Sequence, residues 1–475
     1  MTNKPRLLIP LTGAFCVRYA LRTGLLDRIS EYAQPVILLG WHDPELEQEL
    51  EQGGAEVHPL PKPHFSKRYS RIRNLFEVWH TARLASPSSA IDKRRNRVDW
   101  GLGLRSRRAL HEAFAKIILC LPSSGRLLRA AEQKHLCEDT NLGSVTDWVR
   151  SLHVDAALSL TPFIKSEEMT IRACLTAGIP ACAAILSFDN LTTRGWIPIV
   201  FDQYLLWNRY NETELRRGYP EAVGSPVSIV GPAQLDFYWD DSYIWNEPEW
   251  RARLNLPKNR PVLLFGGGPV SIVPHEPHWL TQLDGAIERA EIPGKPVILF
   301  RRHPLDPVER WKPAIAQAKH VVNDEPWRVG AVPQECNIKR ADLERLVSTL
   351  KHSHVHINTS STLTIDGAVF DRPQIGPAYD DRPGSPYDRI AYELYLREHY
   401  LPITNSGGLE VVRSRSALVA AICSALSDPN RLCEGRKRLV REICTYTDGK
   451  CTERVNAGIR SFMNSSHRVE AVLHC

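Results

Sequence analysis

The sequence predicts an α/β protein made of two domains, each with a parallel sheet. Short apolar runs of strand length alternate with amphipathic stretches of helix length, a pattern typical of strand–helix–strand repeats. A polar, Trp- and Pro-containing stretch at 239–260 interrupts this alternation, which restarts at Pro261. A chain of 475 residues also exceeds what one hydrophobic core usually serves. We therefore expect a first domain at 1–240, a second at 255–455, and a C-terminal helix and tail at 456–475.

The first domain should begin with a strand and continue with strands separated by helices. The opening stretch MTNKPRLLIPLTG is interrupted too early for a signal peptide and is better interpreted as a first strand. A helix is expected at 166–178, since it has acidic residues in its first turn and a glycine at its end. The expected strands are 6–11, 35–40, 55–60, 156–160, 181–186, 203–207 and one that starts at 227.

A basic insertion at about 67–134 separates the third and fourth of these strands. It contains sixteen Lys and Arg against five Asp and Glu, in a chain whose net charge is +6. Two interpretations stay open. The insertion is either a solvated, partly mobile segment or a surface for anionic lipid headgroups or a polyanionic acceptor. Nucleic acid is not an expected partner, because aromatic residues are not interleaved with the basic ones.

The second domain should repeat the alternation from Pro261 onward. Its expected strands are 261–268, 296–304, 320–324, 354–361 and 373–377. A helical region should follow, from 410 to about 465. Open parallel sheets bind ligands beyond the carboxyl ends of their strands. The residues that follow these strands are therefore the candidates for a ligand site.

The first strand of the second domain ends in Gly266, Gly267 and Gly268. Their backbone N–H groups could approach a ligand without interference from side chains. An ordinary turn is the alternative, and a P-loop is excluded because no Gly-Lys-Ser/Thr follows.

The second strand of this domain ends in three basic residues, Arg301, Arg302 and His303. Guanidinium groups suit phosphate oxygens, and histidine can donate to a phosphate or transfer a proton. A charged surface loop is the alternative.

A run of small polar residues, 358–362, lies between the fourth strand of the second domain and the next helix. Backbone N–H groups at a helix N-terminus bind anions, and serine and threonine add donors with little bulk. We therefore predict that Ser360, Ser361 and Thr362 hold a diphosphate, and that Asp366, about one turn later, accepts hydrogen bonds from ribose hydroxyls. An N-cap cluster with a solvated aspartate is the alternative.

The order of these motifs, FGGG, RRHP and INTSSTLTIDGAVFDRPQI, resembles the nucleotide-binding half of GT-B glycosyltransferases. It is most similar to the clan of CDP-glycerol glycerophosphotransferases and non-hydrolysing UDP-N-acetylglucosamine 2-epimerases. The likeness covers about 260–380, and the first domain only in its general architecture. It implies a GT-B fold, with two Rossmann-like domains facing each other across a cleft. It also implies donor phosphates at Arg301 and His303, and a ribose at Asp366, where many relatives have glutamate.

The stretch ILSFDNLTTRGWIP at 185–198 also resembles a segment of surface-polysaccharide transferases of this type. This likeness implies that Asp189 and Asn190 lie opposite the donor site. The loop after the first strand, with Thr12 and Arg18, is where such folds commonly admit the acceptor. Asp189 is the candidate catalytic base and His303 its competitor. A turn cap is the alternative role for Asp189.

The likeness continues at VGPAQLDFY, just before the linker, which resembles the usual crossover into the donor half of these enzymes. It implies that Asp236 lies at the hinge between the two domains.

We expect a glycosyltransferase that moves a sugar from a nucleotide-diphosphate donor to a glycan or lipid-linked acceptor in surface-polysaccharide synthesis. The sequence has no Asp-x-Asp motif, so we expect neither a metal nor a cofactor besides the donor. Three alternatives stay open. They are polyol-phosphate transfer of the CDP-glycerol type, 2-epimerisation of a UDP-sugar, and nucleotide-sugar binding without catalysis.

The cysteines and apolar runs indicate a cytoplasmic protein. The eleven cysteines are scattered and form no CxxC pair, which favours reduced thiols over disulfides or a structural zinc. No apolar run approaches the roughly 20 residues that cross a bilayer. The basic insertion leaves open a peripheral contact with the anionic inner face of the membrane.

Overall fold

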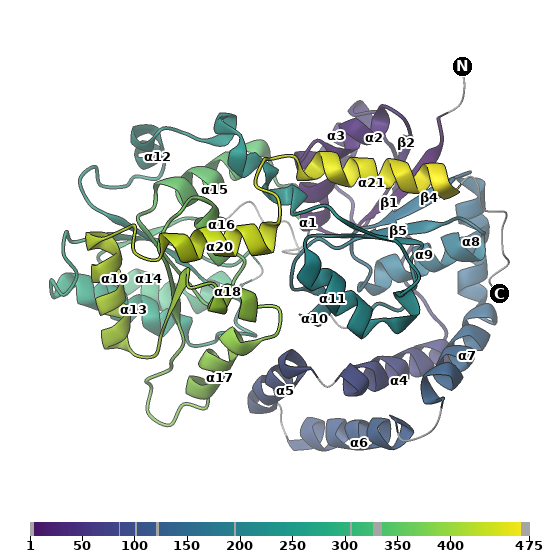
Figure 1. Ribbon diagram of the computed structural model, residues 1–475, viewed down its shortest axis with the longest axis horizontal. Helices are drawn as coiled ribbons and strands as arrows, with labels where there is room; N and C mark the ends of the chain where they lie inside the picture. The colour runs from purple at the N-terminus through teal and green to yellow at the C-terminus, as the bar shows by residue number, and fades with distance from the viewer. Residues whose placement is uncertain are drawn as a thin grey trace. The chain divides into compact units, whose positions relative to one another are not determined.

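The computed structural model describes residues 4–84, 86–99, 102–119, 123–193, 196–304, 306–325 and 335–466. The chain forms two compact units (Figure 1). The first unit runs to Ser89, continues from Asp99 to Gln234 and resumes at Lys450, and the second consists of Ala90–Val98 and Leu235–Gly449. The chain therefore passes between the units four times. Residues 467–475 of the expected tail lie outside the described part.

Seven parallel strands form the sheet of the first unit, in the order β3-β2-β1-β4-β5-β6-β7. The three strands that directly follow the insertion are largely apolar and buried along their whole length, as expected for a parallel sheet covered on both faces. The strands are β1 (Arg6–Leu11), β2 (Gln34–Leu39), β3 (Glu56–Pro59), β4 (Ala156–Ser159), β5 (Ala181–Ala184), β6 (Gln203–Leu206) and β7 (Val227–Ile229).

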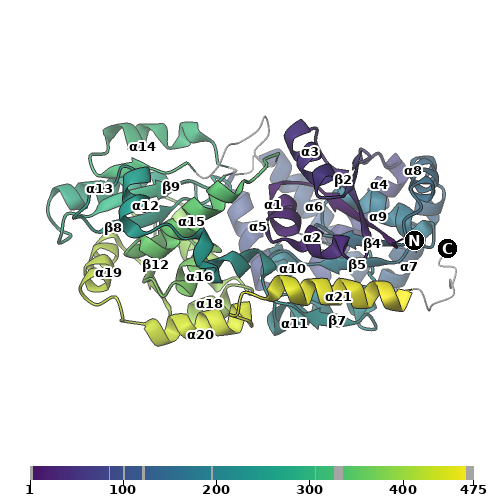
Figure 2. The ribbon, with the colours of Figure 1, turned by 90° about the horizontal axis from the view of Figure 1, so that it is seen from above.

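Helices between these strands cover the sheet of the first unit, and a helix from the end of the chain joins them. α21 (Cys451–Ser466) lies beside α2 and over β4 and β6 (Figures 1 and 2). Gly458 permits this approach, because a Cβ there would lie 2.7 Å from Leu205. The other helices of the unit outside the insertion are α1 (Ala14–Val17), the π-helical η1 (Arg18–Arg22), α2 (Leu25–Ser30), α3 (Pro44–Gln52), α8 (Thr140–Ser151), α9 (Lys165–Thr176), α10 (Asn190–Thr193), α11 (Arg209–Gly218) and η2 (Pro220–Ala222).

The basic insertion is helical. Its helices are α4 (Lys67–Leu84), α5 (Pro87–Asp99), α6 (Leu102–Leu119) and α7 (Ser124–Cys137). α4 packs against both α6 and α7, whereas most of α5 belongs to the second unit. There Arg94 forms an ion pair with Glu393, and Asp92 forms one with Arg397.

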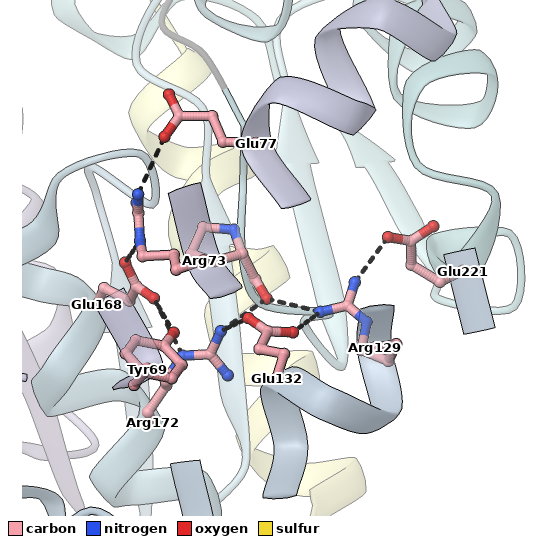
Figure 3. Close-up of polar contacts among 9 residues, drawn as sticks. Tyr69, Arg73, Glu77, Arg129, Glu132, Glu168, Arg172 and Glu221 are labelled. Atoms are coloured by element: carbon pink, nitrogen blue, oxygen red, sulfur yellow. Dashed lines mark hydrogen bonds and ion pairs between the residues drawn. The ribbon is translucent and has the colours of Figure 1, made fainter. Parts of the chain in front are cut away.

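A buried network of charges, drawn in Figure 3, joins the insertion to α9, the helix that connects β4 with β5. Glu168 of α9 accepts hydrogen bonds from Tyr69 (2.6 Å) and Arg73 (2.7 Å) of α4. Arg172, one turn further along α9, donates to Glu132 of α7 at 2.6 Å. These buried ion pairs hold α4 and α7 to α9, so this part of the insertion is anchored to the first unit. The interpretation of the insertion as a solvated segment therefore does not hold for α4 and α7.

Six parallel strands form the sheet of the second unit, in the order β10-β9-β8-β11-β12-β13. The strands are β8 (Val262–Gly266), β9 (Val297–Arg301), β10 (Val321–Asn323), β11 (Val355–Asn358), β12 (Gln374–Pro377) and β13 (Leu409–Val412). The expected parallel α/β architecture is confirmed in both units. The expectation of a continuous helical region from 410 is wrong, since β13 pairs with β12 there and the next helix starts at Arg415.

Helices cover the sheet of the second unit, and buried tryptophans fill part of its core. Trp279 and Trp311 are fully buried and pack among apolar residues of β8 and β9. The helices from the crossover onward are η3 (Ala233–Trp239), η4 (Asp241–Tyr243), α12 (Glu247–Arg253), α13 (Glu276–Glu288), η5 (Val308–Arg310), α14 (Lys312–Gln317), α15 (Arg340–His352), α16 (Leu363–Val369), α17 (Tyr387–Glu393), η6 (Leu394–Leu396), α18 (Leu401–Asn405), α19 (Arg415–Ser427) and α20 (Cys433–Cys444). Asp236, the expected hinge residue, lies in η3, next to the division between Gln234 and Leu235.

Candidate functional site

The strand order of the second unit reverses between β8 and β11, and parallel sheets bind ligands at such a switch point. Gly266, at the end of β8, lies opposite Arg301 of β9 on one side and Asn358 of β11 on the other. The three predicted motifs therefore start at neighbouring positions on one edge of this sheet. The structure brings together the glycines, the Arg-Arg-His segment and the small polar turn.

Side chains pack closely against all three glycines. A Cβ at Gly266 would lie 2.2 Å from Leu363, and one at Gly267 would lie 2.8 Å from Trp311. The backbone N–H of Gly267 donates to the Arg301 carbonyl at 2.9 Å. The N–H of Gly268 donates to the Glu276 carboxylate at 2.6 Å. Two of the three N–H groups are therefore already occupied, and donor binding by this loop stays a prediction.

Arg301 and Arg302 are buried and paired with carboxylates. Arg301 forms a 2.6 Å ion pair with Asp324, and Arg302 forms a 2.9 Å ion pair with Glu325. Both carboxylates follow β10, the strand next to β9 in the sheet. A phosphate at these arginines would have to share them with the two carboxylates. His303 is half-buried and follows directly in the chain.

The polar turn after β11 has an unusual backbone and several internal hydrogen bonds. Ser360 adopts a left-handed conformation with φ of 44°, and its hydroxyl donates to the Leu394 carbonyl at 3.0 Å. The Ser361 hydroxyl accepts from the Leu363 N–H at 3.2 Å, whereas Thr362, the N-cap residue of α16, makes no side-chain capping bond. Thr362 is exposed, and Asp366 lies half-buried in the first turn of α16. Ser360, Ser361 and Thr362 are exposed or half-buried, so they are the residues of this turn that a ligand can reach.

Sequence reasoning missed two polar residues at this edge, His275 and Glu276. Glu276 is fully buried, and burial raises the pKa of its carboxyl to about 8 against the opposing effect of Arg310. Both ring nitrogens of His275 and the Nδ2 atom of Asn358 are buried and have no hydrogen-bond partner among the described residues. His275 and Glu276 stand at the start of α13, and no motif in the sequence marks them. A mostly neutral Glu276 carboxyl could donate a hydrogen bond as well as accept one.

The first unit has the same kind of switch point, between β1 and β4. Thr12, after β1, and Thr161, after β4, are joined by a 2.7 Å hydrogen bond between their hydroxyls. The hydroxyls of Thr161 and Ser159 both donate hydrogen bonds to the carboxylate of Glu167, a fully buried residue of α9. Burial raises the pKa of this carboxyl to about 7, although these hydrogen bonds oppose the shift. Sequence reasoning selected Thr12 here and missed Thr161 and Glu167.

The other predicted acceptor-side residues lie in different parts of the first unit. Arg18 is buried in η1 and donates to the Gln234 carbonyl at 3.0 Å. Asn190 is the first residue of α10 and is also buried.

Asp189 directly precedes the single turn that starts at Asn190, and its backbone carbonyl accepts hydrogen bonds from the N–H groups of Thr192 and Thr193. Its carboxylate accepts hydrogen bonds from Ser187 (2.5 Å) and Thr193 (3.1 Å). Both donors are side-chain hydroxyls, so the turn-cap role, which needs a backbone N–H donor, stays an alternative. Asp189 is half-buried and belongs to the first unit, whereas His303 belongs to the second. The catalytic roles of both stay predictions.

Two general features of the described chain bear on the function. Across the residues with defined positions, no group of three or more His, Cys, Asp or Glu side chains is arranged to hold a metal ion. In the same part of the chain, no helix combines the length and the apolar character that crossing a membrane requires.

Comparisons with known proteins give similarity at the level of structure. No known protein family and no curated protein matches this sequence. Solved structures that are similar over nearly the whole chain include the following three. The S. aureus MnaA–UDP complex has a TM-score of 0.55 at 9% identity and covers 97% of both chains. The UDP-GlcNAc 2-epimerase of Neisseria meningitidis bound to UDP-GlcNAc has a TM-score of 0.53 at 10% identity, covering 96% of this chain and 100% of the other.

The third similar structure is a glycosyltransferase from Rickettsia africae. Its TM-score is 0.51 at 11% identity, with 98% of this chain and 99% of the other covered. At such identities the likeness concerns the fold. Two Rossmann-like parallel sheets, each with a central switch point, together with these similarities, show that the chain has the GT-B fold expected from its sequence motifs.

Proposed function

We propose that this protein is a glycosyltransferase, which moves a sugar from a nucleotide-diphosphate donor to a glycan or lipid-linked acceptor in surface-polysaccharide synthesis. The observation that carries the proposal is the polar turn at 358–362, located at the switch point of the second unit, with the end of β8 between it and the Arg-Arg-His segment. Two proteins with a similar fold have structures with UDP or UDP-GlcNAc bound. A nucleotide diphosphate is the ligand that this arrangement fits best.

In the proposed site, Ser360, Ser361 and Thr362 hold the diphosphate and Asp366 accepts hydrogen bonds from the ribose. Arg301, Arg302 and His303 stabilise the negative charge that develops on the departing diphosphate. Gly266, Gly267 and Gly268 leave room for the residues packed behind this turn.

On the acceptor side, Asp189 takes the proton from the acceptor hydroxyl, and Thr12, Arg18 and Asn190 position the acceptor. The reaction as proposed uses no cofactor besides the donor. Turnover should therefore persist in the presence of a chelator.

A panel of nucleotides tests the donor site directly. We expect a nucleoside diphosphate or its sugar to raise the melting temperature of the protein, because a ligand that binds only the folded state stabilises it. Ser360→Ala combined with Ser361→Ala should weaken this shift. Ser144→Ala combined with Ser151→Ala, at exposed positions of α8, is the matched control and should leave the shift unchanged. Equal nucleotide affinity in both double variants would contradict the assigned donor site.

The products of turnover separate the possible reactions. Sugar transfer breaks the bond between the sugar and the diphosphate and releases a nucleoside diphosphate. Polyol-phosphate transfer breaks the diphosphate itself and releases a nucleoside monophosphate. Epimerisation returns a nucleotide sugar with one inverted centre, and a binding protein releases nothing. Chromatography of the nucleotides after incubation with donor and acceptor distinguishes all four.

A further inference from the structure

The outer face of α6 carries a stripe of exposed apolar side chains. Leu110, Phe114 and Ile117 are 71%, 54% and 64% exposed. Their spacing of four and three residues places all three on one face of the helix. Ala113 and Ser106 on this side are also exposed, whereas Ile118 packs toward the core of the first unit. We name Leu110, Phe114 and Ile117 the α6 stripe.

The inner face of α6 packs on α4, and α6 lies on the side of α4 that faces away from the sheet (Figure 1). α4 is in turn held to α9 by the buried pairs of Glu168 with Tyr69 and Arg73 (Figure 3). The α6 stripe therefore belongs to an anchored helix, with its apolar side chains directed away from the unit that carries it.

The local charge favours an anionic partner. The stretch 102–137, which covers α6 and α7, contains seven Lys or Arg and two Asp or Glu, giving it a net charge of 7 − 2 = +5. The whole chain has a net charge of only +6. An apolar face within a strongly basic segment is the pattern of helices that lie in the surface of an anionic membrane.

The area of the stripe argues against a protein partner. A stable protein interface takes roughly 800 Å² from each side. Three side chains on one helix supply a few hundred Å² at most. A lipid surface needs no matching shape, because its headgroups and acyl chains rearrange around the inserted side chains.

We propose that α6 is an interfacial helix that lies in the surface of an anionic lipid bilayer, with Leu110, Phe114 and Ile117 inserted at the boundary of the acyl chains. Basic residues of the insertion attract the protein to the anionic bilayer over a long range, and burial of the α6 stripe stabilises the bound state. The proposal is independent of the nucleotide site. It holds or fails whichever reaction the protein catalyses.

Flotation of the full-length protein with lipid vesicles tests this proposal. The vesicles contain phosphatidylglycerol and phosphatidylcholine in equal parts, and vesicles of pure phosphatidylcholine show the contribution of charge. The test variant is Leu110→Ser/Phe114→Ser/Ile117→Ser. The matched control is Val200→Ser/Val223→Ser, which removes exposed apolar side chains elsewhere in the first unit. Circular dichroism and thermal unfolding show that each variant is folded.

We expect the unaltered protein and the control to float with the anionic vesicles at about 0.05 M salt and to bind pure phosphatidylcholine much less. The test variant should partition at least about a hundredfold more weakly, because each fully buried apolar side chain contributes a factor of ten or more. Absence of vesicle binding by the unaltered protein would overturn the proposal. Equal binding by the test variant would also overturn it, because charge alone would then suffice. A dimer that dissociates only in the test variant, without vesicle binding, would assign the stripe to a second copy of the chain instead.

Discussion

Replacing Glu168 by glutamine should strongly destabilise the first unit. Glu168 is 1% exposed and accepts hydrogen bonds from Tyr69, Arg73 and Arg172 (Figure 3). Glutamine has nearly the same size but only one acceptor oxygen, and its NH₂ group would face an arginine. The exchange therefore leaves two buried guanidinium groups without their shared carboxylate.

The expected cost follows from this burial. Removing one partner of a buried ion pair typically costs about 3–5 kcal/mol, since the remaining charge stays desolvated. Glu77 pairs with the same Arg73 at 3.1 Å, but its side chain is 42% exposed. Glu77→Gln should therefore cost less than about 1 kcal/mol. Both exchanges replace a glutamate that pairs with Arg73 by glutamine. The difference between their costs in stability therefore measures the effect of burial.

Hydrogen exchange, read peptide by peptide over α4, α7 and α9, measures the local opening free energy. Glu168→Gln should accelerate exchange in these helices by roughly two to three orders of magnitude, because 1.4 kcal/mol corresponds to a factor of ten. Peptides from the second unit provide the internal reference. Similar acceleration by Glu168→Gln and Glu77→Gln would refute the reasoning.

The effect should also depend on pH with a definite sign. Burial acts to raise the pKa of Glu168, but Arg172 and then Arg73 outweigh it and hold the pKa below its usual value. A carboxylate with a lowered pKa in the folded state stabilises above its unfolded pKa of about 4.3, and this contribution is lost as the pH falls through the folded value. The difference between the unaltered protein and Glu168→Gln should therefore be full at neutral pH and narrow below about pH 4.3.

Three further predictions concern other sites. Asp189→Asn keeps the size of the side chain and most of its hydrogen bonds, so donor affinity should persist. Turnover should fall by at least roughly a hundredfold, because the variant lacks the base. Near-normal turnover in steady-state kinetics would mean that Asp189 only caps its turn. Glu276→Gln should flatten the loss of thermal stability between about pH 4.3 and pH 8, because the carboxyl ionises above about pH 4.3 in the unfolded chain but stays protonated up to about pH 8 in the fold. An unchanged pH profile of the melting temperature would contradict this. Gly435→Ala should destabilise by roughly 1–3 kcal/mol, since its Cβ would lie 2.1 Å from the Gly407 backbone. The control Gly143→Ala, in an exposed helical position with open space around it, should stabilise by about 0.5–1 kcal/mol in urea denaturation.

The sequence predicted strands at the positions of β1 to β12 but missed β13. β4, β5 and β6 are short runs buried on both faces, so each appears as a continuous apolar segment. β13 has a half-exposed centre with Glu410, and an apolar helix follows after two residues. Without a clear alternation, the two elements looked like one helical stretch.

For the candidate site, sequence showed which residues follow the strands but not what they contact. The partners of Arg301 and Arg302 lie 23 residues downstream, at Asp324 and Glu325, and only the pairing of β9 with β10 brings them close. The glycines at the end of β8 were interpreted as room for a ligand, and the pattern did not show that a Cβ at Gly266 or Gly267 would meet Leu363 or Trp311. Such contacts depend on tertiary packing, which local patterns do not report.

The return of α21 to the first unit has a consequence for synthesis of the chain. Domains generally fold in the order in which they leave the ribosome, the N-terminal one first. Here β4 and β6 lack α21, the helix that covers them, until Cys451–Ser466 has been translated, after the whole of the second unit. The unit that is made first is therefore completed last. Until then its apolar sheet face is open to chaperones, and a stop codon before α21 would leave that face uncovered permanently.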